Sequence, residues 1–144
     1  MWSDTLLAAE RSHLIRLVIW AATSAVFGTS LASIIALRRL AAPILLWFAI
    51  QTLAWGSVEL LMSAARWRGL AMRDVSAATQ LDRLTWLGVG LDVGLIAVGV
   101  TAIVLAWAPK RRLGTLGGGL GIVVQGLGLL VLDLTFASML ERLV

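Results

Sequence analysis

Four long apolar runs, separated by short segments rich in arginine, constrain the fold of this chain more than any other feature. They are expected at residues 14–37, 44–65, 84–108 and 113–140. Each has the roughly 20 apolar residues that an α-helix needs to cross a bilayer. A strand in lipid would leave its backbone groups without hydrogen bonds, so all four runs are predicted to be transmembrane helices.

Composition points to the same class of protein. Of the 144 residues, 60% are hydrophobic and only 14% are charged. A soluble domain of this size has too high a surface-to-volume ratio to hide so much apolar surface. We therefore expect an all-α membrane protein, with residues 1–144 forming a single four-helix transmembrane domain. The N-terminal segment has acids before its apolar run and does not resemble a signal peptide, so the first helix is expected to be retained.

Several classes of function are disfavoured by the residues themselves. The chain has no cysteine and a single histidine, so thiolate metal sites and bis-histidine haem are excluded and no metal or cofactor is expected. Its net charge of +4 comes from basic residues at helix ends, which suits a bilayer partner better than nucleic acid. No catalytic residues are expected, because GVGLDVG around Asp92 does not match the GxGD signature of intramembrane aspartyl proteases.

Topology is predicted from the charge of the turns. The tight turns at 38–43 and 109–113 carry arginine and lysine without an acid, which favours a cytoplasmic location for the turns and an outside location for both termini. The other side also carries many basic residues, mixed with acids. The reverse orientation and dual topology therefore stay open.

The two halves of the chain share three ordered markers about half a chain apart. Repeat one would span about 10–66 and repeat two about 82–142. The markers are Glu10-Arg11 with Asp82-Arg83, Arg38-Arg39-Leu40 with Arg111-Arg112-Leu113, and Gln51 and Glu59 with Gln125 and Asp133. This pattern predicts a tandem duplication of a two-helix hairpin, with a pseudo-two-fold axis along the membrane normal. The alternative is chance similarity between apolar helices.

Three carboxylates lie inside the apolar runs: Glu59, Asp92 and Asp133. Helix rise places all three about 10–14 Å from the end that carries the termini. One base, Arg16, is predicted to reach them, so the acids outnumber the bases, and an acid in lipid neutralises itself by binding a proton or a cation. The cluster is therefore predicted to bind a proton, a cation or another ligand, with four further residues beside it: Gln51, Gln125, Trp20 and Trp55.

Some polar and small residues have a structural interpretation. The carboxylates could instead hold helices together through hydrogen bonds while keeping their protons. Glycines at small-xxx-small spacing are predicted to let helices approach closely, among them Gly90, Gly94, Gly117 and Gly121. His13 is interpreted as a histidine at a helix end.

Three segments resemble a family of small four-crossing bacterial membrane proteins of unknown function. They are ERSHL at 10–14, GLDVGLIAVG at 90–99 and RRLGTLGGGLGIVVQGLGLLVLD at 111–133. The family pattern implies GLD on the third helix and QG followed by an acid on the fourth. The first helix departs from it at Thr23 and Ser24, where an asparagine is expected. The resemblance implies the fold and a bacterial inner-membrane location, and it implies no activity.

Two functional hypotheses follow. The first is a small transporter, channel or solute-binding protein, as a homo-oligomer or within a larger complex, that uses the carboxylates for a proton or cation. The second is a structural or accessory subunit whose carboxylates only join helices.

Overall fold

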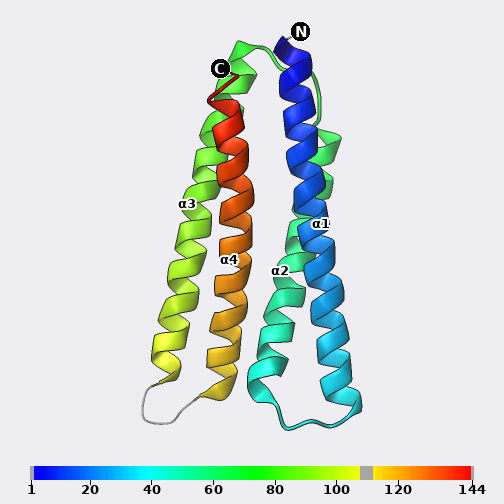
Figure 1. Cartoon of the computed structure of the whole chain (residues 1–144), viewed down its shortest axis with the longest axis vertical. Helices are drawn as coiled ribbons and strands as arrows, with labels where there is room; N and C mark the ends of the chain where they lie inside the picture. The colour runs from blue at the N-terminus through cyan, green and yellow to red at the C-terminus, as the bar shows by residue number, and fades with distance from the viewer. Residues whose placement is uncertain (1, 108–111, 144) are drawn as a thin grey trace.

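The structure, a computed structural model, describes residues 2–107 and 112–143. It is an antiparallel arrangement of four helices: α1 (Trp2–Leu37), α2 (Pro43–Arg68), α3 (Val75–Ala106) and α4 (Leu113–Leu140). Both chain ends lie at one end of the molecule and both tight turns at the other (Figure 1). All four helices are long and apolar enough to cross a membrane. The four predicted helices are therefore present, whereas Pro109, Lys110 and Arg111 of the second turn lie outside the described residues.

Two helices begin earlier than the apolar runs indicate. The first was expected from residue 14 and begins at Trp2, because Leu6 buries its side chain against Phe136 and Leu140. The third was expected from residue 84 and begins at Val75. The Asp74 side chain caps it, accepting a hydrogen bond of 2.8 Å from the backbone N–H of Ala77.

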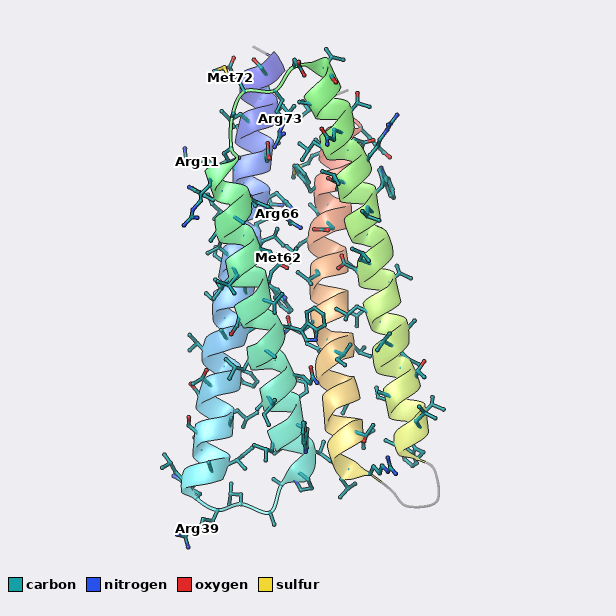
Figure 2. The ribbon with its side chains drawn as sticks, turned by 180° about the vertical axis from the view of Figure 1, so that it is seen from behind. Arg11, Arg39, Met62, Arg66, Met72 and Arg73 are labelled. Carbon is teal, nitrogen blue, oxygen red and sulfur yellow. The ribbon has the colours of Figure 1, made fainter. Side chains whose placement is uncertain are left out.

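Helix α4 is the centre of the arrangement. It packs against α1, α2 and α3, and the hairpin pairs α1–α2 and α3–α4 make the most extensive contacts. Within the described residues, no Cα atom of α3 comes within 8 Å of a Cα atom of α1 or α2. A gap therefore separates α2 from α3 along one side of the molecule (Figure 2).

Bare glycine surfaces explain why α4 takes this position. A Cβ atom at Gly119 would lie 2.8 Å from the carbonyl oxygen of Gly99 on α3, so these two backbones touch. On its other side, a Cβ atom at Gly117 would overlap the backbone of Ile44 at the start of α2. A Cβ atom at Gly121 would lie 2.8 Å from Cβ of Gln51. Small residues on two faces of α4 allow two helices to approach it closely.

The remaining predicted packing glycines lie differently. Nothing in the described residues comes within 4 Å of a Cβ atom built at Gly90 or at Gly94. Both residues are exposed on the side of α3 that has no neighbouring helix. The same spacing that lets helices touch on α4 is thus without a contact inside this chain on α3.

The arrangement of the helices departs from two-fold symmetry. A two-fold axis that relates α1 to α3 and α2 to α4 would match each α1–α4 contact with an α3–α2 contact. The structure has the first and lacks the second within its described residues. The two halves therefore share hairpin topology without sharing their contacts.

Candidate functional site

A line of polar side chains follows the contact between α1 and α4, which we call the α1–α4 seam. The indole N–H of Trp20 donates to Oε1 of Gln125 at 3.0 Å, and Nε2 of Gln125 donates to Oγ of Ser24 at 3.0 Å. Gln125 is 2% exposed, so these bonds satisfy an amide that has no access to solvent. Gly128 makes room for Trp20, because a Cβ atom there would overlap the indole ring.

Nearer the end that carries the termini, the seam brings a histidine and a carboxylate together. Nε2 of His13 lies 3.3 Å from Oδ1 of Asp133. The imidazole stacks on the ring of Phe136, with centroids 4.3 Å apart and planes inclined by 7°. A Cβ atom at Gly88 would lie 2.6 Å from Oδ2 of Asp133, so the glycine on α3 is what leaves room for this carboxylate. His13 and Asp133 are both buried.

Glu59 and Asp92 lie near this pair. Asp92 is within electrostatic range of Asp133 and Glu59, and Glu59 is within range of His13 as well. Oδ2 of Asp92 is buried and has no hydrogen-bond partner among the described residues. Glu59 is half-buried, and its Oε1 accepts a long hydrogen bond of 3.5 Å from Oγ of Ser63. The three acids predicted to cluster therefore do share one region of the interior.

The base near these acids is not the one proposed from the sequence. Arg16 is exposed and makes no ion pair with a described acid, whereas Arg66 at the end of α2 acts electrostatically on both Glu59 and Asp92. The predicted polar stripe on the first helix included His13, Arg16, Trp20 and Thr23. The inward face instead holds His13, Leu17, Trp20 and Ser24, which rotates the stripe by about one residue and turns Arg16 outward.

A cavity of about 390 Å³ opens beside the His13–Asp133 pair. Its volume is that of a small-ligand pocket. The wall includes residues from all four helices and from the segment between α2 and α3. Polar or charged members are Glu10, His13, Arg66, Arg73, Thr85 and Asp133. Figure 2 shows Arg66 and Arg73 on the side of the α2–α3 gap, while Arg11 points away from it.

An ion pair closes the outer end of this cavity. Nε and Nη2 of Arg73 donate to the two carboxylate oxygens of Glu10, at 2.9 and 2.6 Å. This hydrogen bonding raises the pKa of Arg73 above its usual value. Glu10 is 6% exposed, so the pair fixes the segment between α2 and α3 onto α1 and leaves Arg66 as the cavity's other guanidinium.

The remaining predicted residues lie on the α2 side of the gap. Gln51, Trp55 and Glu59 share one face of α2 at intervals of four residues, and all three are half-buried. Gln51 lines a second cavity, of about 360 Å³, near the tight turns. Within the described part of the chain, no three His, Asp or Glu side chains lie close enough to hold a metal ion together.

Sequence reasoning missed His13 and Arg66 as members of the site. Both lie at the ends of apolar runs, where basic residues are expected to face headgroups. Spacing could have indicated His13, since it is seven residues from Trp20 and eleven from Ser24, and so shares their face. Nothing in the sequence placed Arg66, because its position depends on how α2 packs against α4.

Fold and site together define an all-α protein with four antiparallel helices and a carboxylate-containing polar interior. The chain belongs to a family of unknown function, DUF6992, whose family model matches residues 16–134. The matched region contains Glu59, Asp92 and Asp133 and ends before Phe136. No curated protein and no solved structure matches the chain.

Proposed function

We propose that the chain is an integral membrane protein that binds a proton at the Glu59–Asp92–Asp133 cluster and transports it or couples it to a solute. The proposed location rests on the outer surface, where large apolar side chains are exposed on all four helices, among them Ile19 on α1, Leu61 on α2, Leu91 on α3 and Val131 on α4. Such a surface on every side suits lipid as the surrounding solvent.

The observation that carries the proposal is the position of Asp133. Its carboxylate lies 3.3 Å from His13, within electrostatic range of two further acids, and on the wall of an open cavity. Three acids face two basic groups, His13 and Arg66. Charges removed from water are costly unless paired, and an excess acid removes that cost by taking up a proton.

The geometry favours a proton over a metal cation. A metal ion with oxygen ligands needs several donors at about 2–2.6 Å around one point. No such group of three exists in the described residues. A histidine beside a carboxylate is instead a pair that exchanges protons near neutral pH. His13 and Asp133 therefore act as the pair that receives the proton from the cavity.

A flux measurement tests this proposal. Purified protein is reconstituted into liposomes that contain a pH-sensitive dye, and proton entry is recorded after a pH step or with candidate solutes present. Asp133→Asn and Asp92→Asn are expected to abolish the protein-dependent flux, because neither amide can take up the proton. Glu141→Gln is the control, since Glu141 is exposed at the end of α4 and lies outside the cavity. Unchanged flux in both aspartate variants would refute a role for the cluster.

Orientation and location are part of the proposal. The tight turns would face the cytoplasm and the termini the outside of a bacterial inner membrane, because Arg38 and Arg39 lie in a turn without acids. A reporter fused to the C-terminus that is active only outside the cytoplasm would support this orientation. Activity of a cytoplasmic reporter at the same position would reverse it.

A tandem duplication is proposed from the three sequence markers. Asp92 occupies the position in the second half that Trp20 occupies in the first. If each hairpin is an independent unit, residues 1–68 and 69–144 expressed as separate chains should each insert and should associate. Failure of either half to insert would count against two independent units.

The alternative function is a structural or accessory subunit in a homo-oligomer or larger membrane complex. One observation favours it: the open face of α3 around Gly90 and Gly94 has no helix against it. Purification from native membranes under mild detergent tests it. A fixed stoichiometric partner together with wild-type flux in Asp133→Asn would favour the accessory role.

A further inference from the structure

A second cavity lies at the opposite end of the same gap between α2 and α3. It has a volume of about 360 Å³. Its wall comes from α2, α3 and α4 and includes Trp47, Gln51, Ala102, Arg112, Thr115 and Gly118. Gly118 leaves its floor bare, since the nearest atom to a Cβ built there belongs to Gln51 at 3.7 Å. The first cavity, beside Asp133, is lined by the same three helices and by α1.

The two cavities are separated by a short central stretch. On α3 they are bounded by Leu91 and Ala102, which helix rise places about 16 Å apart. Asp92 lies at the start of this stretch, with its Oδ2 buried and unpartnered among the described residues. A buried carboxylate oxygen without a protein partner is the kind of group that ordered water satisfies.

Trp55 occupies the corresponding place on α2. It lies one helical turn from Gln51, which lines the second cavity, and one turn from Glu59, which belongs to the carboxylate cluster. Its side chain is half-buried and makes no hydrogen bond with another described residue. A large apolar ring at a narrow point can keep water from forming a continuous file.

We infer that the α2–α3 gap is a water-containing path between the two ends of the bundle, with the second cavity as its entrance from the tight-turn end and Trp55 as the barrier at its centre. Polar residues line both entrances, and no helix backbone closes the gap between them. A proton entering on water at either end would meet Glu59 and Asp92. This identity of the permeant rests on the proposed function, while the water path itself does not.

The chain lacks cysteine, so single cysteines can be introduced without other changes. Leu91→Cys probes the first cavity and Gly118→Cys the second. Matched controls two residues further along each helix are Val93→Cys and Leu120→Cys, at exposed positions that line neither cavity. Each variant in membrane vesicles is treated from one side at a time with a charged, membrane-impermeant thiol reagent.

The path predicts labelling of Leu91→Cys from the terminus-bearing side only and of Gly118→Cys from the tight-turn side only, with both controls unlabelled. Absence of labelling at Gly118→Cys from both sides, or labelling equal to that of Leu120→Cys, would overturn it. Labelling in the predicted pattern together with no proton flux would leave the path standing and would refute the proton as its permeant.

The barrier has a separate test. Trp55→Ala is expected to raise the passive proton leak of proteoliposomes by about tenfold or more, because removing the ring lets water fill the narrow point. Trp55→Phe keeps an aromatic ring there and should restore a low leak. A leak in Trp55→Ala that equals the wild-type leak, with the protein folded, would show that Trp55 is not the barrier.

Discussion

The α1–α4 seam and the α2–α3 gap carry similar polar residues in different states. In the seam, Gln125 bonds to Trp20 and Ser24, and Asp133 faces His13. In the gap, Gln51 lines a cavity and Asp92 has an oxygen without a described partner. One pair of helices is in contact across α4 and the other is not.

The difference teaches that residue type alone does not separate structural from functional polar groups in an apolar protein. A buried amide with both ends bonded stabilises a helix contact. The same amide beside a cavity remains available to water or a ligand. The comparison therefore assigns stability mainly to the seam and chemistry mainly to the gap, with Asp133 belonging to both.

The largest expected effect is at the tightest point of the seam. Gly128→Val should destabilise the protein by about 3 kcal/mol, because its side chain overlaps the Trp20 ring and breaks the bond to Gln125. Gly94→Val is the control, since the position is open. Unfolding in mixed detergent micelles measures both variants. Equal loss in the two would show that the seam is not specially packed.

An intermediate effect is expected from a matched pair of glutamines. Gln125→Leu should cost about 1–2 kcal/mol, since it leaves the Trp20 N–H and the Ser24 hydroxyl unpaired. Gln51→Leu should change stability by less than about 0.5 kcal/mol, because no bond is lost. The same unfolding assay applies. A larger loss for Gln51→Leu would reverse the assignment of seam and gap.

The smallest expected effect has the opposite sign. Asp92→Leu should stabilise the protein by about 1 kcal/mol, because it removes a buried acid with an unpartnered oxygen, while abolishing flux. Asp133→Leu should instead destabilise, since His13 loses its partner. If Asp92→Leu destabilises as much as Asp133→Leu, Asp92 has a structural partner in the protein.

The sequence by itself determined the number of helices, their antiparallel order and the presence of three acids in the interior. These follow from local rules: apolar run length, basic turns and helix rise depend on neighbours in the chain. Even the near-equal placement of Glu59, Asp92 and Asp133 could be obtained by counting residues from helix ends.

Only the tertiary structure decided which helices touch and therefore which polar groups are paired. Glycine spacing alone could not distinguish Gly117 and Gly121, which meet α2, from Gly90 and Gly94, which meet nothing in the described residues. The replacement of Arg16 by Arg66 and His13 has the same cause. A helix rotation of one residue turns a side chain by about 100°, and the packing of α1 and α2 against α4 sets that rotation.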